Sequence, residues 1–433
     1  MAIDNKDKKV LKSSIEREQN EVACSAECEK IKGSKNLNVP PLRFPEFTEE
    51  WKAEQLDNIA TLSKGIGISK EQLSEDGEPC ILYGELYTKY KSEIIKQVES
   101  KTDINGSKLK RSKANDVIIP CSGETAVDIA TARCVPFDNI LFGGDLNVIS
   151  LHQYDGAFMS YQLNGKRKYD IARVAQGVSI VHLYGEHLKA IKTYNPTLPE
   201  QQKIAKLLSL LDDRIDTQNK IIEKLQSLIK GLNDNIPKGI KGETVCFSDL
   251  GEAYSGLSGK GGDDFGYGEP FITYMNVYQN TYISEKDYEL VQIAPNEKQN
   301  SVQYGDALFT LSSETPEEVG IGAVYLGNTQ KLYLNSFCFG IHFYDERVLP
   351  QYLAHFISSS SFRRAIYPLA QGSTRFNLQK NDFMKMKFLL PSLEKQGHIA
   401  NTLDALHCRL ANEKSLTEQY ILLKKYLLSL MFI

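Results

Sequence analysis

The chain has 433 residues, of which 41% are hydrophobic and 24% are charged, and its formal net charge is −4. This length and composition predict a globular protein of two or three domains. No stretch approaches about 18 consecutive apolar residues, and the polar N-terminus lacks a signal-peptide core, so we expect no membrane span. The weak negative charge argues against non-specific coating of nucleic acid, but it allows local basic patches. The cysteines are scattered, which is typical of reduced thiols in a cytoplasm.

Residues 1–40 are rich in Lys, Glu, Asn and Ser and have few large apolar side chains, a composition that predicts a disordered tail. Cys24 and Cys28 stand four residues apart, but no second pair completes a metal site, so we expect no bound metal. Residues 41–198 are expected to form a first mixed α/β domain. Within it, short apolar runs at 80–83 and 117–119 predict strands between turns.

Residues 199–237 predict one long helix with an unbroken apolar seam. The seam alternates in steps of four and three, the heptad pattern of a helix that pairs with another helix. Pro199 suits the first turn, and Pro237 cannot continue the helix. At 1.5 Å per residue the span 199–232 would be about 50 Å long. The seam residues are Ile204, Leu208, Leu211, Ile215, Gln218, Ile222, Leu225, Ile229 and Leu232.

Residues 391–433 predict the partner helix. Its seam is less regular, with a phase shift of one residue near Glu413. At an offset of 195 residues Gln218 corresponds to Glu413, so we expect the two polar residues to meet if the helices pair antiparallel. Two unrelated amphipathic helices on separate cores are the alternative. The seam residues are Ile399, Leu403, Leu406 and Leu410, followed by Leu416, Tyr420, Leu423, Leu427 and Leu430.

The rest of the chain is also duplicated. Residues 116–125 (DVIIPCSGET) resemble residues 306–315 (DALFTLSSET) at an offset of 190, and an Ala-Gln-Gly triplet recurs at an offset of 195. A period this long indicates a duplicated domain rather than a solenoid. We therefore expect residues 238–390 to form a second mixed α/β domain, and the fold class to be α+β with two similar domains joined by an antiparallel, pseudo-twofold pair of long helices. The expected elements of this second domain are strands at 271–274, 308–311, 333–334 and 337–343 and a helix at 351–366.

The sequence shows no reaction centre. The histidines include no HExxH spacing, and residues 255–261 (SGLSGKG) depart from the phosphate-loop pattern. Residues 195–197 (NPT) differ from the Asn-Pro-Pro-aromatic motif of adenine methyltransferases. We therefore predict that the chain has no catalytic residue and no metal or cofactor of its own.

A basic cluster precedes each Ala-Gln-Gly triplet. Arginine and lysine neutralise phosphates, and glutamine can pair with adenine in the major groove, so these segments are candidates for DNA contact. A solvated charge beside an ordinary turn is the alternative for each residue. Glu124 and Glu314 could accept from cytosine, but we favour a role in capping a turn. The candidates are Lys166, Arg167, Lys168, Arg173, Gln176 and Gly177 in the first copy, and Arg363, Arg364, Gln371, Gly372 and Arg375 in the second.

These features together resemble the specificity subunit of a type I restriction–modification system, over residues 41–433. The strongest match is residues 198–205 (LPEQQKIA), which are similar to the start of the family's central conserved helix. Residues 41–47 (PLRFPEF), with Trp51, resemble the usual opening of a target recognition domain. The second copy, residues 392–400 (SLEKQGHIA), keeps the Gln, Ile and Ala but lacks the lysine of the pattern.

The resemblance implies that residues 41–198 and 238–390 are target recognition domains, each reading half of a bipartite site on double-stranded DNA. The two domains are dissimilar between their matched landmarks, so we predict two different half-sites and an asymmetric site. It implies that helices 199–237 and 391–433 space the two halves and dock methyltransferase (M) subunits, which bind S-adenosylmethionine and methylate adenine. Restriction (R) subunits that use ATP and Mg²⁺ would join the complex, in a bacterial or archaeal cytoplasm. The chain itself would be non-catalytic and would bind no cofactor.

Two other functions remain open. A fused methyltransferase or nuclease of a related system is disfavoured by the missing catalytic motifs. A coiled-coil scaffold without a nucleic-acid role is disfavoured by the basic Gln-Gly segment that recurs in both copies.

Overall fold

The computed structural model describes residues 38–105, 108–235, 242–344 and 346–433. Their contacts divide them into two units. Unit 1 contains the described residues up to Asp212 together with Leu423–Ile433, and unit 2 contains those within Asp213–Leu422. Most of the predicted tail, with Cys24 and Cys28, lies outside the described residues, and so does Pro237. No described helix is long and apolar enough to cross a membrane.

The centre of unit 1 is an antiparallel sheet in the order β2 (Ala60–Lys64), β10 (Leu146–Leu151), β6 (Asp116–Pro120), β8 (Arg133–Val135). A second sheet has the order β4 (Lys101–Thr102), β3 (Glu78–Ile81), β9 (Leu141–Phe142), β5 (Lys110–Arg111), and β3 and β9 run parallel. Two strand pairs complete the unit: β1 (Lys52–Gln55) with β12 (Lys192–Asn195), and β7 (Ser122–Gly123) with β11 (Val181–His182).

The apolar run of β6 is buried on both faces. Side chains alternate along a strand, so Val117 and Ile119 join one cluster with Met159 of α5 (Gly156–Asn164), while Ile118 joins another with Phe142. Burial on both faces explains why β6 carries apolar residues at consecutive positions, although it belongs to an antiparallel sheet. The shorter helices of unit 1 are α2 (Leu56–Ile59), α3 (Glu85–Thr88), α4 (Ala126–Ile129), α6 (Lys168–Val174) and α7 (Gly185–Lys189).

Unit 2 repeats this plan. Its central sheet has the same order, β14 (Gly251–Ser255), β21 (Cys338–Phe343), β17 (Ala307–Thr310), β19 (Gly322–Val324). Another sheet is β16 (Tyr288–Val291), β15 (Phe265–Ile272), β20 (Tyr333–Leu334), with β15 and β20 parallel as in unit 1. The remaining strands are β13 (Glu243–Cys246) with β24 (Lys387–Leu390), and β18 (Ser312–Ser313), β23 (Phe376–Leu378), β22 (Ala370–Gln371).

The matching strand order confirms the predicted duplication. The single helix expected at 351–366 is wrong, because Ser359 has extended backbone angles and separates α11 (Pro350–Ser358) from α12 (Ser360–Ile366). The Ser359 hydroxyl accepts from the Phe362 backbone N–H, so it caps the second helix. The other helices of unit 2 are α9 (Phe247–Leu250), α10 (Tyr274–Gln279) and α13 (Lys380–Met384).

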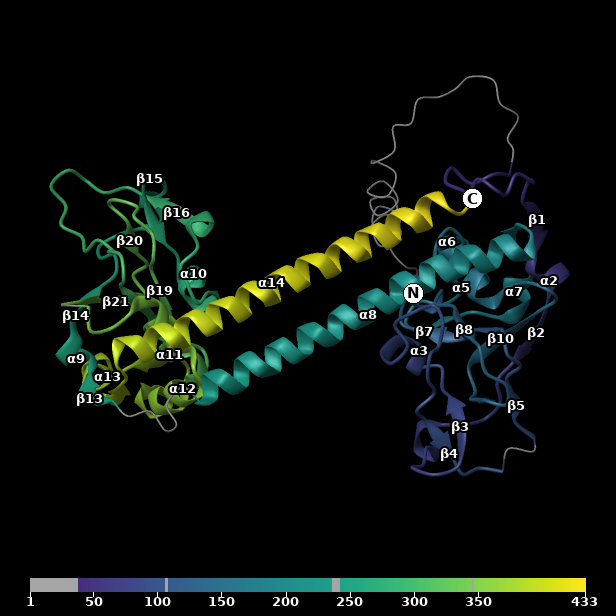
Figure 1. The fold of residues 1–433 in the computed structure, drawn as a ribbon, viewed down its shortest axis with the longest axis horizontal. Coiled ribbons are helices and arrows are strands. Elements are labelled where there is room, and N and C mark those ends of the chain that lie inside the picture. The colour runs from purple at the N-terminus through teal and green to yellow at the C-terminus, as the bar shows by residue number, and fades with distance from the viewer. Residues whose placement is uncertain (1–37, 106–107, 236–241, 345) are drawn as a thin grey trace, which may run out of the picture. The chain divides into compact units, whose positions relative to one another are not determined.

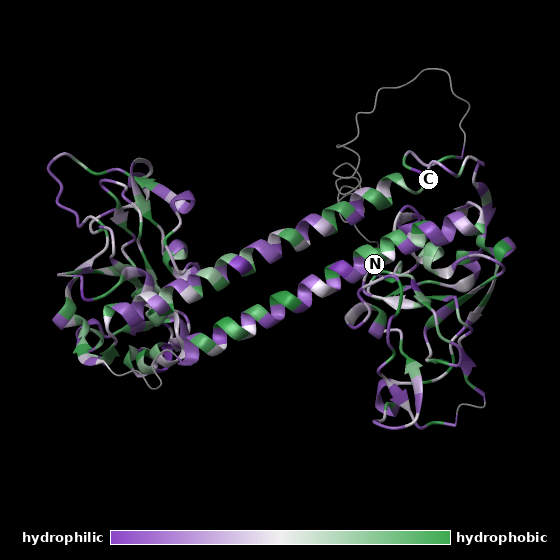
Figure 2. Ribbon diagram, in the orientation of Figure 1, coloured by the Kyte–Doolittle hydropathy of each residue, from purple (hydrophilic) through white to green (hydrophobic). Residues whose placement is uncertain are grey.

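Two long helices, α8 (Leu198–Asn235) and α14 (Leu393–Leu430), are drawn in teal and yellow in Figure 1 and have 38 residues each. Hydrophobic and hydrophilic residues alternate along both (Figure 2). A glutamine near the start of each helix fastens it to its neighbouring domain. Gln201 accepts from the Asp155 N–H at 2.9 Å, and Gln396 accepts from the Leu349 N–H at 2.7 Å. The Gln of the repeated motif therefore has a structural role in both copies.

The helices pair antiparallel. In unit 2, Arg214 of α8 donates to the Tyr420 hydroxyl of α14 at 3.3 Å, and Gln218 donates to Glu413. The residue number rises along one helix as it falls along the other, as the predicted meeting of Gln218 and Glu413 requires.

The seam of α14 keeps one phase, so the predicted shift near Glu413 is wrong. Thr417 is only 7% exposed and continues the seam after Glu413, whereas Leu423 lies off the seam and is 44% exposed. Leu232, at the end of the predicted α8 seam, is also exposed. The buried seam residue after Glu413 is the polar Thr417, whereas apolar periodicity alone favours the neighbouring Leu416 and so predicts the wrong phase.

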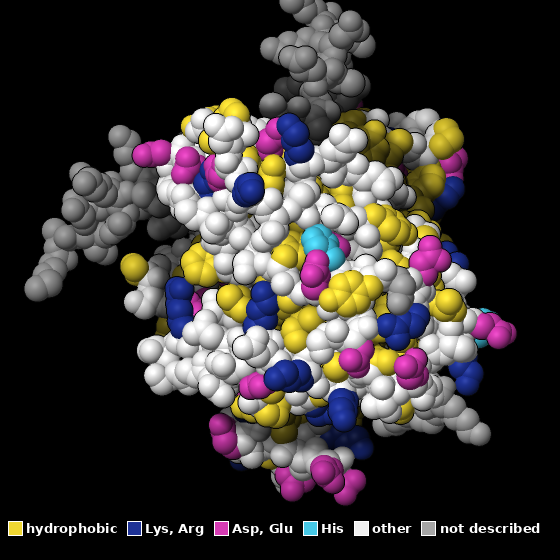
Figure 3. All heavy atoms as spheres, turned by 90° about the vertical axis from the view of Figure 1, so that its left-hand side faces the viewer, with side chains coloured by type: hydrophobic (Ala, Val, Ile, Leu, Met, Phe, Trp, Pro, Cys, Tyr) yellow, Lys and Arg dark blue, Asp and Glu magenta, His cyan; other side chains and the backbone are white. Residues whose placement is uncertain are grey.

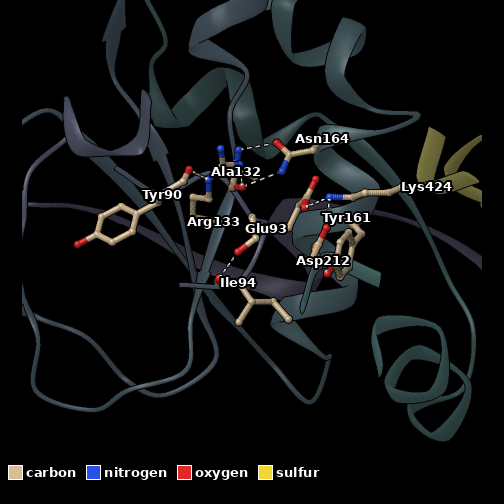
Figure 4. A network of polar contacts seen from close by, with 10 residues as sticks. Tyr90, Glu93, Ile94, Ala132, Arg133, Tyr161, Asn164, Asp212 and Lys424 are labelled. Atoms are coloured by element: carbon tan, nitrogen blue, oxygen red, sulfur yellow. Dashed lines mark hydrogen bonds and ion pairs between the residues drawn. The ribbon is translucent and has the colours of Figure 1, made fainter. Parts of the chain in front are cut away.

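Lys424 occupies the next seam position after Tyr420, and it lies in unit 1. Figure 4 shows the side chain with its polar partners. Its ammonium lies 2.6 Å from Asp212 of α8 and 2.5 Å from Glu93, and the Tyr161 hydroxyl donates to Asp212 at 2.6 Å. The three charged side chains are at most 16% exposed. Burial lowers the pKa of Lys424, but attraction by the two carboxylates outweighs this and raises it overall, so the ammonium stays charged.

Candidate nucleic-acid interface

The Ala-Gln-Gly triplet of unit 1 begins a tight hairpin. Gln176 and His182 exchange backbone hydrogen bonds of 2.9 and 2.6 Å. Gly177 has a φ of +124°, and a Cβ there would lie 2.1 Å from the Ile180 carbonyl oxygen, so only glycine fits. Strand β11 then pairs with Ser122 and Gly123 of β7. The hairpin and the repeated segment 116–125, which are far apart in the sequence, therefore lie side by side.

Unit 2 builds the same arrangement. Gln371 pairs with Asn377, and β23 pairs with Ser312 of β18. Gly372 has a φ of +148°, and a Cβ there would lie 2.0 Å from the Arg375 carbonyl oxygen. Residues 176–182 and 371–377 are called the recognition hairpins below.

Each recognition hairpin borders a hollow. The hollow of unit 1 is about 1100 Å³ and that of unit 2 about 330 Å³. Their linings correspond at offsets of 190 to 195 residues. The first is lined by Tyr83, Tyr87, Ser122, Glu124, Asp128 and Ile180, and the second by Tyr274, Tyr278, Ser312, Glu314, Glu318 and Arg375.

Tyr87 and Tyr278 of the hollows keep their protons at neutral pH. Burial raises the pKa of Tyr87, and the hydrogen bond to Glu318 raises the pKa of Tyr278. The same bond, with one from Ser313, lowers the pKa of Glu318. These hydroxyls therefore act as hydrogen-bond donors, and the carboxylate of Glu318 is occupied.

Two of the predicted DNA-binding arginines make hydrogen bonds within the fold. Arg363 donates to three backbone carbonyls, those of Glu317, Val319 and Gly320, at 2.6 to 2.7 Å. Arg167 donates to the main-chain oxygen of Ile433 at 2.9 Å and contacts Asp170. These bonds give both guanidinium groups a structural role, and the DNA contact suggested for each residue stays a prediction.

The other predicted residues remain on the surface. Lys166, Gln176, Arg364, Gln371 and Arg375 are exposed, and Lys168 is half-buried. Arg173 is also exposed, but it is paired with Asp170 at 2.9 Å. Of these side chains only Arg375 lines a hollow.

Glu124 and Glu314 do not cap the turns that follow them. In unit 1 the cap of α4 is Thr125, whose hydroxyl accepts from the Asp128 N–H at 3.1 Å. Both glutamates are exposed in their hollows and have no hydrogen-bond partner among the described residues. Sequence reasoning missed the tyrosines of the hollows; the repeated Tyr83 and Tyr274 were a signal that could have identified them.

The face of the molecule drawn in Figure 3 carries side chains of both charges. On the face drawn in Figure 3, basic and acidic side chains alternate with hydrophobic ones and form no single basic patch. Among the residues with described positions, no cluster of three or more His, Cys, Asp or Glu could hold a metal ion.

Comparison with known proteins places this arrangement in one family. The model of the type I restriction modification DNA specificity domain matches the chain twice, over residues 48–227 and 242–419. The chain is 23% identical over 421 residues to the type I restriction enzyme MjaVIII specificity subunit of Methanocaldococcus jannaschii, covering 90% of this chain and 93% of that protein.

Two solved structures share the fold. The type I restriction-modification S subunit from M. genitalium matches with a TM-score of 0.55 and 14% identity, over 91% of this chain and 99% of that one. A chain from a structure concerned with complex assembly and conformational transition of the type I R-M system matches with a TM-score of 0.53 and 14% identity, over 90% of this chain and 99% of that one. Neither the fused-enzyme nor the scaffold alternative finds support. Because the family model matches most of the sequence, the chain belongs to the type I restriction modification DNA specificity domain family and is a specificity subunit.

Proposed function

We propose that unit 1 and unit 2 each read one half of a bipartite, asymmetric DNA site, and that α8 and α14 set the spacing between the halves. The observation that carries this proposal is the recurrence of one hairpin and one hollow in both units, with different side chains at equivalent places. Because the two units have similar backbone folds, they can approach DNA in the same way, while the side chains that differ between them can select different bases.

Methyltransferase (M) and restriction (R) subunits are the proposed protein partners. Exposed apolar side chains on the long helices support a protein contact, because contiguous exposed apolar patches mark surfaces that a partner covers. Leu422 and Tyr426 are such neighbours, one turn apart on α14. Leu210 is 52% exposed on α8, and Leu422 and Tyr426 are 62% and 59% exposed on α14.

The chemistry of the complex is assigned to those partners. The M subunits would bind S-adenosylmethionine and methylate adenine, and the R subunits would use ATP and Mg²⁺ to cleave DNA in a bacterial or archaeal cytoplasm. This chain would supply sequence selection and assembly without a cofactor of its own. The absence of a catalytic motif from the sequence supports this division.

The test is a methylome. The chain is co-expressed with its M subunit in a bacterium that lacks adenine methylation, and modified adenines are sequenced. We expect a motif with two specified halves and an unspecified spacer. Replacing residues 246–390 with those of a relative should change one half only. A stable complex that leaves no methylation motif would contradict DNA reading, and failure to form any complex would contradict the assigned role of the helices.

A further inference from the structure

We infer that the tips of the two recognition hairpins select bases, and that they select different classes of base. The tip of unit 1 is Val178-Ser179-Ile180 and the tip of unit 2 is Ser373-Thr374-Arg375. The geometry points to Arg375 as a reader of guanine and to Val178 with Ile180 as readers of the thymine methyl group. This inference rests on the proposed function and assigns the residues that carry it out.

The hairpins separate scaffold from specificity. The two hairpins share a glutamine at equivalent positions, Gln176 and Gln371, and a glycine that forms the same tight turn. Identical residue types at these positions cannot distinguish one half-site from the other. The three residues that follow each glycine are exposed and face no such backbone constraint. Side chains can therefore differ there while the turn is kept.

Arg375 suits guanine. It lines the hollow of unit 2, is exposed, and makes no hydrogen bond or ion pair with any residue in the described part of the chain. The N–H groups of Arg363 donate to backbone carbonyls, whereas the N–H groups of the planar Arg375 guanidinium are free to donate to a ligand. That fork matches the O6 and N7 acceptors of guanine in the major groove.

A second group in the same hollow fits the base pair as a whole. The carboxylate of Glu314 also lacks a partner among the described residues, while that of Glu318 accepts from Tyr278 and Ser313. A free carboxylate accepts from the N4 amino group of cytosine. Arg375 and Glu314 together therefore offer the donor and the acceptor that G·C pairs require.

The tip of unit 1 has the opposite chemistry. Val178 is 80% exposed and Ile180 is 60% exposed, and Ile180 borders the hollow. Apolar side chains in the major groove recognise the C5 methyl group of thymine. Glu124 in the same hollow supplies an acceptor for an exocyclic amino group.

The experiment compares the chain–M complex with three variant complexes. Arg375→Ala removes the proposed guanine contact, and Val178→Ser with Ile180→Ser removes the apolar tip. The control is Lys385→Ala, which removes an exposed positive charge at the end of α13 that does not line the hollow. For each, the methylome is read, and DNA binding is measured on the wild-type site and on sites changed at one base pair. Complex formation and melting temperature are followed as checks on folding.

For Arg375→Ala we expect discrimination to fall by roughly 5- to 150-fold at one guanine, in the half-site that the domain swap assigns to unit 2. Lys385→Ala should leave the motif unchanged. The double serine variant should relax a thymine in the other half only.

Three results would overturn the inference. The first is an unchanged methylation motif in Arg375→Ala, and the second is a wild-type unit 2 half-site that contains no guanine. The third is loss of M-subunit binding in the serine variant, because Val178 would then be a protein contact. A wild-type complex without any bipartite motif is a different outcome, because it defeats the proposed function itself.

Discussion

The side-chain amide of Gln218 in α8 donates to the carboxylate of Glu413 in α14, and the two side chains are only 2% and 4% exposed. Arg409, one turn before Glu413 on the same helix, pairs with that carboxylate as well. In a seam of mostly apolar residues, one hydrogen-bonded polar pair penalises every register that separates its members.

Removing the amide should therefore cost stability. Gln218→Leu leaves a buried carboxylate oxygen without its donor, which typically costs about 1–3 kcal/mol. Chemical denaturation monitored by circular dichroism would measure the loss. The double variant Gln218→Leu with Glu413→Leu should recover most of it, because both polar partners are gone. A double variant less stable than the single one would show that the pair has no such role.

Lys424→Met should destabilise unit 1 by about 3–5 kcal/mol, since Asp212 and Glu93 would be left buried without their cation. Burial already raises the pKa of Asp212, and loss of Lys424 should raise it further. A folded-state pKa above the unfolded value gives stability that is present at low pH and is lost as the pH rises through the folded-state value. The destabilisation should therefore be larger at about pH 8 than at about pH 5.

The exposed neighbour Lys425 provides the control for this variant. Lys425→Met should change the unfolding free energy by no more than about 0.5 kcal/mol at either pH. Equal losses for the two methionine variants would contradict a buried role for Lys424.

His355 should make unit 2 sensitive to acid. Its ring is fully buried, 2.7 Å from Asp404 and 3.3 Å from the Tyr282 hydroxyl, and it stacks on His407. Burial lowers the pKa of His355 below its ordinary 6.5, despite the attraction of Asp404. A lowered pKa in a base gives stability that is present above the unfolded value and is lost as the pH falls below it. The melting temperature should drop between about pH 7.5 and 5.5, and drop less in His355→Phe; parallel pH profiles would contradict this.

Arg363→Lys should destabilise unit 2 although the charge is kept. An ammonium cannot reach the three carbonyls that the guanidinium spans, and loss of one charge-assisted bond costs about 1.5–3 kcal/mol. Arg364→Lys, on the exposed side of α12, should have almost no effect. Urea titration of both variants measures the difference, which should vanish if Arg363 contacts only solvent or DNA.

Gly372→Ala should distort the recognition hairpin of unit 2. An alanine at a φ of +148° would place its Cβ against the Arg375 carbonyl, and such strain costs about 1–3 kcal/mol. DNA binding should weaken with it. Gly231→Ala is the contrast, because that glycine lies inside α8 with open space around it, and the change should stabilise by roughly 1 kcal/mol. Equal effects on the unfolding free energy would contradict the strain at Gly372.

The long helices, their polar centre and the duplication could be predicted from sequence because they depend on local periodicity and on repeated motifs. The continuation of the seam through Lys424 could not. Hydropathy alone does not predict a lysine at a buried seam position. The lysine is stable there because it pairs with Asp212 and Glu93, which lie hundreds of residues away in the chain.

For the candidate site, the sequence predicts the segment of the chain but not the individual residues that contact DNA. Basic residues before a Gln-Gly turn mark a segment that can meet DNA, but the sequence does not show which guanidinium is already engaged. Arg363 and Arg375 are equally basic in the sequence, and only folding gives one of them three carbonyl partners and leaves the other at a hollow.

The Lys424 cluster also bears on how the two halves of the chain can assemble. At the repeat offset of 195, Lys424 corresponds to Ile229, which lies beside His407, the counterpart of Asp212. In a homodimer of the first half, Ile229 would face Asp212, and that carboxylate would be buried without a cation. In a homodimer of the second half, Lys424 would face His407 instead of a carboxylate. The two halves are therefore not equivalent at this position, because Asp212 and Glu93 of the first half are neutralised by a lysine of the second half.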